Sequence, residues 1–489
     1  THLWIYSIDK QSSRQLTEGD ANEREGTWSP DGSTIAFLSA VDDDRWISPL
    51  GHVFAVAVDG GTPVPVTPKG GWGWVGYSPS GELHVIGRPL ERMTLDTLPL
   101  QKLHGDGSLQ QLTDLDRDLQ PGHPPGLLAG PRFLEDGTIH TLLEDRGSQR
   151  VIAIGLDGEV ADVVGGNRII TGWDPDPSGT TAVFTATSPT EPGEVYLWDG
   201  EKEVALTAFN RQFAEDANLS EPVDFTYESD GEEIHGWVLL PDGDESVPTV
   251  LMIHGGPAAQ YGWGFFDEFQ VLAGAGYGVV AVNPRGSSGY GEAHKKVPIG
   301  RWADPVPPDQ ADLMEAPFAA SRQFPRLDTD RLGIMGGSYG GLSTIMITSL
   351  DDRYRSAVAE RGVYNFVSFG GTTDIPWFTR LYLDQDVETD ADGIWRASAL
   401  ARATGTTTPT LVIHSEGDYR TPVEQGQQLF MLLYRQGVET ELLLFPVDEG
   451  HELSRSGKPR HRVERFDAIL QWHARYLGDD RTGIDGVPN

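Results

Sequence analysis

A turn followed by a short run of β-forming residues recurs four times in the N-terminal half of the chain. Trp28-Ser-Pro-Asp-Gly32 leads into Ile35–Leu38, and the other copies repeat this order of turn and apolar run. The four turns close at Gly32, Gly81, Gly137 and Gly179, at intervals of 49, 56 and 42 residues. These intervals are close to the length of a four-stranded β-propeller blade. Each turn therefore predicts a hairpin, and the run after it an inner strand.

A second pattern alternates with the first. Its copies are Leu3–Ile8 with Leu16-Thr17, Val53–Val58 with Val66-Thr67, and Val195–Trp198 with Leu206-Thr207. These segments are typical of the outer strands of blades, and together the two patterns predict about four and a half propeller blades over residues 1–209. Half a blade at Thr1 would leave an open sheet edge, which favours aggregation, so we expect a trimmed N-terminus.

From residue 221 onward, buried-type strands alternate with amphipathic helices, which predicts a mostly parallel sheet with helices on both faces. The expected strands are Thr249–His254, Gly278–Asn283, Leu332–Gly336, Ser356–Glu360, Thr410–His414 and Glu441–Pro446. The expected helices are Phe266–Ala275, Gln310–Gln323, Tyr339–Leu350, Val423–Gln436 and Arg460–Leu477. Pro317 should kink the second of these helices or delay its start.

The polar residues 210–220 are predicted to link the two parts. The expected domains are thus a propeller over 1–209, this linker, and a mostly parallel α/β domain over 221–489.

One motif carries candidate chemistry. The strand Leu332–Met335 runs directly into Gly336-Gly337-Ser338-Tyr339-Gly340-Gly341 and then into a predicted helix. This is the G-x-S-x-G nucleophile elbow in its expected context of strand, sharp turn and helix. Its glycines leave room for a serine on a strained backbone.

A serine hydroxyl needs a base, and the base needs an orienting acid. Asp418 and His451 each follow a predicted strand and occur in the order Ser, Asp, His that α/β-hydrolases use. Glu416 and Asp448 remain alternatives for the acid. His254 and His414 stand at strand ends and are poorer candidates for the base.

An oxyanion also needs hydrogen-bond donors. The segment His254-Gly-Gly-Pro257 follows a strand at the place where this fold supplies one backbone N–H, and Tyr339, the residue after the serine, should supply the other. A tight turn without chemistry is the alternative for this segment.

Composition narrows the function classes. The 489 residues contain 37 Lys and Arg against 73 Asp and Glu, a formal net charge of −36, which disfavours nucleic acid or an anionic membrane surface as a partner. Cysteine is absent, which excludes disulfides, thiolate metal sites and a cysteine nucleophile.

No metal motif or cofactor motif is found, so we expect neither group, and we expect a cytoplasmic protein. Only 7 of the 37 basic residues are Lys, which suits a salt-adapted host or, alternatively, a GC-rich genome.

These motifs together resemble the prolyl oligopeptidase family of serine peptidases. Four segments resemble its acylaminoacyl-peptidase branch: His254–Pro257, Asn283–Gly291, Asp418–Pro422 and Gly450–Gly457. The resemblance covers residues 221–478 closely and residues 1–207 only through the blade pattern. It implies that Ser338 is the nucleophile, His451 the base, Asp418 its orienting acid, and that the Gly256 and Tyr339 amides form the oxyanion hole. The propeller portion is shorter than the six to eight blades usual in the family, which puts substrate gating in doubt.

Candidate substrate-binding residues follow the strand that ends at Glu360. Val363, Tyr364, Phe366, Trp377 and Phe378 would line an apolar primary pocket, or else belong to the core. Arg285 and Arg420 would bind a peptide carbonyl or carboxylate, or else form structural ion pairs. No Glu-Glu pair can be assigned to capture of a free N-terminus.

The sequence therefore predicts a serine peptidase that hydrolyses short, N-acylated or free, peptides through an acyl-enzyme, with the propeller restricting substrate size. A small-ester hydrolase with the same triad is the first alternative. A propeller binding module with a vestigial hydrolase is the second. A homo-oligomer is a possible state.

Overall fold

The computed structural model describes residues 1–119 and 130–478. The chain divides into two compact units. The first comprises residues 1–188, 193–209 and 289–292, and the second comprises residues 189–192, 210–288 and the chain from Ala293 onward. Each unit is considered by itself.

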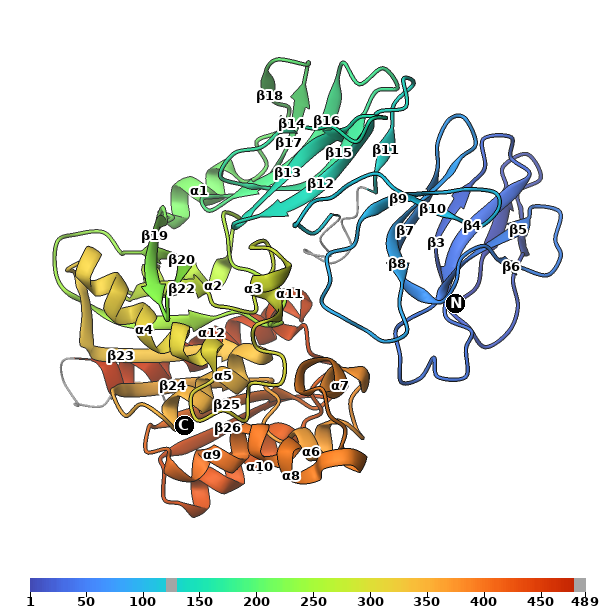
Figure 1. The fold of residues 1–489 in the computed structure, drawn as a ribbon. Coiled ribbons are helices and arrows are strands. Elements are labelled where there is room, and N and C mark those ends of the chain that lie inside the picture. Colours follow the sequence, from blue (N-terminus) through green and yellow to red (C-terminus); the bar gives the residue numbers. More distant parts are fainter. Residues whose placement is uncertain (120–129, 479–489) are drawn as a thin grey trace. The chain divides into compact units, whose positions relative to one another are not determined.

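The first unit is built from consecutive β-hairpins (Figure 1). It begins with the hairpin β1 (Trp4–Ser7) and β2 (Ser12–Gln15). Two four-stranded sheets follow: β3 (Glu23–Trp28), β4 (Thr34–Ser39), β5 (His52–Ala57) and β6 (Val64–Pro65), then β7 (Gly70–Tyr77), β8 (Leu83–Pro89), β9 (Leu100–Leu103) and β10 (Leu109–Gln111). The next strands are β11 (Arg132–Phe133), β12 (Ile139–Asp145), β13 (Ser148–Ile154) and β14 (Val160–Val164), then β15 (Ile169–Pro175), β16 (Ala182–Ser188), β17 (Glu191–Trp198) and β18 (Glu203–Ala205). The β11–β14 and β15–β18 sets are joined by one parallel pairing, Gln149 with Ile169.

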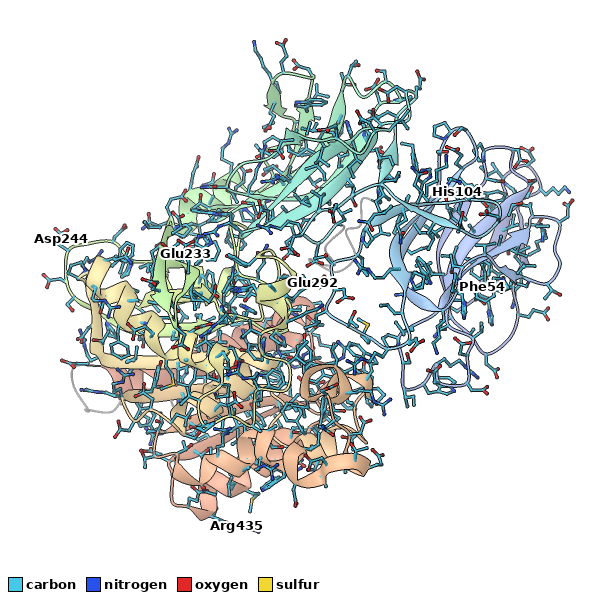
Figure 2. The ribbon with its side chains drawn as sticks, in the orientation of Figure 1. Phe54, His104, Glu233, Asp244, Glu292 and Arg435 are labelled. Atoms are coloured by element: carbon cyan, nitrogen blue, oxygen red, sulfur yellow. The ribbon has the colours of Figure 1, made fainter. Side chains whose placement is uncertain are left out.

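The turn glycines explain why the repeat predicted these hairpins. Gly32, Gly81, Gly137 and Gly179 all have φ between 70° and 87°, a backbone region that glycine enters without steric cost. Aromatic side chains pack within the sheets: Phe37 stacks on Phe54 with ring centroids 5.6 Å apart. Figure 2 labels Phe54 among the strands of the first unit. Among the described residues the first unit thus holds four sets of four strands and the β1–β2 hairpin, as the sequence pattern predicted.

The second unit contains an eight-stranded sheet in the order β19-β20-β22-β21-β23-β24-β25-β26. Its strands are β19 (Val223–Ser229), β20 (Glu232–Leu239), β21 (Val247–Ile253), β22 (Gly278–Asn283), β23 (Leu327–Gly337), β24 (Tyr354–Glu360), β25 (Thr410–Ser415) and β26 (Thr440–Phe445). Strands β21 to β26 run parallel to one another, while β20 pairs antiparallel with β22, and β19 pairs antiparallel with β20 at the edge of the sheet. This is the α/β-hydrolase arrangement that the alternation of strands and helices predicted.

Helices cover both faces of this sheet (Figure 1). The helices α2 (Asp267–Gly274) and α12 (Pro459–Leu477) share one apolar core with the sheet, whereas α4 (Pro308–Gln323) and α5 (Tyr339–Thr348) pack on β23 and β21 from the other face. The remaining helices are α1 (Arg211–Ala217), α3 (Glu292–Lys296), α6 (Phe366–Phe369), α7 (Trp377–Leu383), α8 (Val387–Ala397), α9 (Ala399–Arg402), the 3-10 turn Ala403–Gly405, α10 (Glu424–Arg435) and α11 (Leu453–Ser456). Within the described residues, no helix is both long enough and apolar enough to cross a bilayer.

Three details differ from the sequence prediction. The segment expected to be a plain linker contains helix α1, none of whose residues is buried. The antiparallel strands β19 and β20 were not predicted: β19 alternates exposed and buried residues, and β20 begins with two exposed glutamates before its buried run. Helix α4 begins two residues earlier than expected, at Pro308, and continues through Pro317. Of the two effects expected of Pro317, a kink or a late start, the late start was wrong, and Pro308 occupies the first turn, where a proline is tolerated.

Candidate active site

Ser338 lies at the sharp turn between β23 and α5. Its backbone has φ 63° and ψ −120°, a region that a residue with a side chain rarely adopts. The Ser338 N–H donates to the Glu360 carbonyl at the end of β24 at 3.0 Å, and the Ser338 carbonyl accepts from Leu342 N–H at 3.0 Å. Hydrogen bonds on both sides thus hold the strained residue in place.

The glycines around Ser338 are required by close packing of the backbone. A Cβ on Gly336 would lie 2.6 Å from the Ile253 carbonyl oxygen, and one on Gly340 would lie 2.2 Å from the same oxygen. Both approaches are closer than any side-chain carbon tolerates. The turn can therefore form only with glycine on each side, as the G-x-S-x-G pattern predicted.

Asp418 and His451 come together at the carboxyl ends of β25 and β26. The His451 Nδ1 lies 2.8 Å from Asp418 Oδ2, and the carboxylate is fully buried. Because an ionised carboxylate can only accept, Nδ1 carries the proton and the neutral ring keeps Nε2 free as a base. This is the tautomer that a serine hydrolase needs.

Hydrogen-bond donors hold the Asp418 carboxylate from the other side. Its Oδ1 accepts from the backbone N–H groups of Arg420 at 2.9 Å and Thr421 at 2.8 Å, and the Thr421 hydroxyl lies 2.9 Å from Oδ2. The two alternative acids are placed differently. Glu416 is exposed, and Asp448 is exposed and paired with Lys458. Of the three carboxylates, Asp418 alone contacts the His451 ring.

The electrostatics suit a base and its acid. Burial lowers the pKa of His451 below its usual value, although the hydrogen bond to Asp418 opposes that shift. Burial alone would raise the pKa of Asp418, but the contacts with His451 outweigh it, so the pKa of Asp418 is lowered. His451 is therefore neutral and Asp418 ionised at neutral pH. In the described part of the chain the Ser338 hydroxyl makes no hydrogen bond to His451, a contact that often forms only with substrate bound.

The loop after β21 lies against the nucleophile. A Cβ on Gly255 would be 3.5 Å from Ser338 Cβ, which places the His254–Pro257 segment beside the serine. Gly256 has φ 126°. Tyr339 is the first residue of α5, so its N–H has no acceptor within the helix. Both predicted oxyanion donors thus belong to segments that meet at Ser338.

Comparisons with known proteins point to one family. Residues 263–480 match the sequence profile of the prolyl oligopeptidase family. The chain is 37% identical over 339 residues to the uncharacterized peptidase YuxL of Bacillus subtilis, covering 68% of this chain and 51% of that protein. It is 28% identical over 493 residues to dipeptidyl-peptidase 5 of Aspergillus oryzae, covering 94% of this chain and 65% of that protein.

Residues 263–480 belong to the prolyl oligopeptidase family.

The chain spans about half to two thirds of the length of these curated relatives. Among solved structures, the acylaminoacyl peptidase of Pyrococcus horikoshii superposes with a TM-score of 0.79 at 23% identity, covering 99% of this chain and 86% of the other. A puromycin-hydrolyzing peptidase of Mycobacterium tuberculosis superposes with a TM-score of 0.76 at 22% identity, covering 96% and 72%. At these identities the likeness shows the fold, a β-propeller with an α/β-hydrolase.

Arg285 and Arg420 were the two candidates for substrate binding, and both pair with carboxylates of this protein. Arg285 is 7% exposed, and its guanidinium donates to Asp312 at 2.7 Å, to Asp230 at 3.0 Å and to the Pro308 carbonyl. These contacts are those of a structural ion pair, one of the two roles predicted for Arg285, and they leave few of its N–H donors for a peptide. Arg420 is half-exposed and pairs with Asp374 at 2.6 Å, so it remains accessible beside Asp418.

The predicted aromatic pocket is largely a packed cluster. Tyr364 and Phe366 are fully buried, and Val363 and Phe378 nearly so, whereas Trp377 is half-buried. The centre of the cluster is Trp302, which stacks on Tyr339, Phe366, Phe378 and Tyr382. These contacts are those of a core beneath the nucleophile turn, which is the alternative that the sequence left open.

Sequence reasoning missed the polar group that anchors this cluster. Asp309 of α4 is fully buried, and its Oδ2 accepts from Trp302 Nε1 at 2.9 Å and from the Tyr339 hydroxyl at 2.6 Å. The hydrogen bond to Asp309 therefore fixes the side chain of Tyr339, one of the two predicted oxyanion residues. The signal in the sequence was weak, because Asp309 directly follows Pro307 and Pro308, and such a stretch indicates only a disturbed helix start.

Proposed function

We propose that this protein is a serine peptidase that hydrolyses short peptides, N-acylated ones included, through an acyl-enzyme. The observation that carries the proposal is the buried Asp418 carboxylate 2.8 Å from His451, at the sheet edge where Ser338 stands on its strained turn. Membership of the prolyl oligopeptidase family supports the choice of a peptide bond over other acyl compounds.

In this mechanism the Ser338 Oγ attacks the carbonyl carbon of the scissile bond, and its proton passes to His451 Nε2. Asp418 stabilises the imidazolium that forms. The Gly256 and Tyr339 N–H groups donate to the oxyanion. His451 then gives its proton to the leaving amine as the carbon–nitrogen bond breaks, which leaves the acyl group on Ser338. Water activated by His451 attacks this ester and releases the acid product.

The remaining parts of the proposal concern location and partners. With a charge of −36 the protein should bind peptides and not nucleic acid or membranes. A chain without cysteine needs no oxidising compartment, so a cytoplasmic location is proposed, which cell fractionation would test.

Labelling with a fluorophosphonate tests the nucleophile. The probe should attach to Ser338, as mapped by mass spectrometry, and Ser338→Ala should not react. Cleavage is then compared for one peptide with an acetylated and a free N-terminus and for a p-nitrophenyl ester. Labelling with turnover of the ester alone would favour the small-ester hydrolase, and absence of labelling would favour a vestigial hydrolase.

A further inference from the structure

Arg361 occupies an unusual position at the candidate site. It is the first residue after β24, and its φ of 36° lies in the left-handed region. Its N–H donates to the Ile413 carbonyl at 2.8 Å, and its own carbonyl lies 2.9 Å from the Thr421 hydroxyl that also contacts Asp418. A strained backbone held from both sides beside a triad is a feature that favours a functional role.

The guanidinium of Arg361 lies against the nucleophile turn. A Cβ on Gly337 would be 2.8 Å from Arg361 Cζ and from its Nη2. Gly337 stands at the x position of G-x-S-x-G, where the elbow itself does not require glycine. Because Gly337 has no side chain, the Arg361 guanidinium can pack against the backbone directly before Ser338.

The same guanidinium reaches the histidine loop. Its Nη2 donates to the Ser454 hydroxyl at 2.9 Å, and Ser454 belongs to α11, which begins two residues after His451. One side chain therefore contacts both the turn that carries Ser338 and the helix that follows His451.

Glu360 and Glu268 stabilise the positive charge of Arg361 only from beyond ion-pair distance, and burial lowers the pKa of its guanidinium. Across residues 1–119 and 130–478 it forms no ion pair, and its Nε is buried without a hydrogen-bond partner. Its neighbour Glu360 instead pairs with Arg465 on the other side of the strand. An unpaired cation in a buried setting acts strongly on the titratable groups near it.

We propose that Arg361 is a positioning residue that ties the nucleophile turn to the histidine loop and holds His451 in its neutral, basic form. This inference rests on the proposed function, because it assigns His451 the role of the base.

The charges around His451 are consistent with this role. Asp418 and the half-buried Glu452 favour its protonated form, while the Arg361 cation disfavours it together with burial. Glu452 is itself paired with Arg455 of α11, and His414 of β25 lies 3.7 Å from Asp418. Burial lowers the pKa of His451 first, and Arg361 lowers it further against the pull of Asp418. Without the cation, His451 should take up a proton at a higher pH.

The test measures the rate of Ser338 labelling by a fluorophosphonate between about pH 4 and pH 9. Arg361→Met and Arg361→Gln remove the charge, Arg361→Lys keeps it, and Ser454→Ala removes only the hydrogen-bond partner. Arg326→Met is the matched control, because Arg326 stands at the opposite end of β23 and donates to the backbone carbonyls of Pro241 and Glu245. Thermal melting by circular dichroism shows which variants are folded.

Both neutral variants should shift the acid-side midpoint of labelling upward by roughly half a pH unit or more. Arg361→Lys and Ser454→Ala should label more slowly with a midpoint close to that of the wild type, and Arg326→Met should match the wild type throughout. An unchanged or lowered midpoint in the folded neutral variants would overturn the inference. So would loss of folding in both of them, because Arg361 would then be a residue of the core.

The two hypotheses fail in different ways. If wild-type Ser338 does not react with the probe, the proposed function fails. If it reacts with a midpoint that is insensitive to the charge at position 361, the proposed function stands and only the role of Arg361 is lost.

Discussion

At the scale of single residues, the site depends on two residues whose backbone conformations are unfavourable for a residue with a side chain. Ser338 and Arg361 both have positive φ, and both are anchored by hydrogen bonds to neighbouring strand ends. Each such conformation costs about 1–3 kcal/mol, which the surrounding sheet must supply. These conformations place Ser338 at the turn between β23 and α5 and the Arg361 guanidinium against Gly337.

Substitutions in the candidate triad should have graded effects. Ser338→Ala and His451→Ala should each lower kcat by about 10⁶, since nucleophile and base act as one unit. Asp418→Asn should lower it by about 10⁴, because the amide would hold the wrong histidine tautomer. Asp448→Asn, at an exposed carboxylate paired with Lys458, is the control and should retain activity. Equal damage from Asp418→Asn and Asp448→Asn in steady-state assays would refute the assignment of the acid.

Gly337→Ala should impair activity far more than stability. The new Cβ would meet the end of the Arg361 side chain, which can move aside, so folding should survive. Displacing the guanidinium should lower kcat/KM by roughly ten- to a hundredfold, because small misplacements at an active site are costly.

The control for that substitution is Gly274→Ala at the exposed end of α2, where an added Cβ would contact nothing within 4 Å. It should leave activity unchanged and stability equal or higher by up to about 1 kcal/mol. If the two variants behave alike in activity and melting, the close contact at Gly337 has no functional meaning.

At the scale of elements, a buried ionic cluster joins α12, α2 and β24 behind the nucleophile turn. Arg465 of α12 is 1% exposed and donates to Glu360 of β24 at 2.5 Å and to Glu268 of α2 at 2.7 Å. Glu360 is also the residue whose carbonyl accepts the Ser338 N–H. The cluster therefore connects the packing of two helices to the position of the serine.

Arg465→Met should destabilise the protein by about 3–5 kcal/mol, because it leaves two buried carboxylates without their cation. Arg460→Ala removes an exposed partner of Glu464 on the same helix and should cost less than about 0.5 kcal/mol. Urea unfolding followed by circular dichroism measures both. A loss below about 1 kcal/mol for Arg465→Met would mean that the cluster is dispensable.

At the scale of the whole molecule, the dominant feature is the net charge of −36. Like charges at this density repel one another in the folded state, and dissolved salt screens that repulsion. A salt-adapted host would select such a surface.

The melting temperature should therefore keep rising beyond roughly 0.5 M NaCl. Calorimetry in a series of NaCl concentrations measures this, with a non-ionic osmolyte as the control for general solvent effects. A flat or falling melting temperature would favour genome composition as the reason for the few lysines.

Substrate size is the second property of the whole chain. The family resemblance implies that the propeller restricts access to the serine, so a peptide of roughly ten residues should be cut and a folded protein should not. Unfolded casein distinguishes a size filter from a simple need for unfolded chain. Comparable turnover of casein and the short peptide would contradict this expected restriction of substrate size.

Local sequence determined much of this protein. Turn glycines with positive φ predicted the hairpins, because only glycine enters that region freely. Runs of apolar residues predicted β22 with its observed bounds and the other central strands to within a few residues, since strands buried on both faces must be apolar throughout. The G-x-S-x-G turn and the order of Ser338, Asp418 and His451 also indicated the chemistry. The reason is again local, because the steric requirements of the turn are met by residues adjacent to the serine in the sequence.

Tertiary structure alone decided which distant charges meet. Arg361 and Ser454 are separated by 93 positions, and Arg465 and Glu268 by 197, so no local pattern indicates either contact. Arg285 could have bound substrate or formed an ion pair until the packing of α4 placed Asp312 beside it. The aromatic residues after β24 could have lined a pocket until Trp302 stacked on them. A side chain's partners depend on how strands and helices pack in space, and that arrangement separates a structural cation from one that acts on the site.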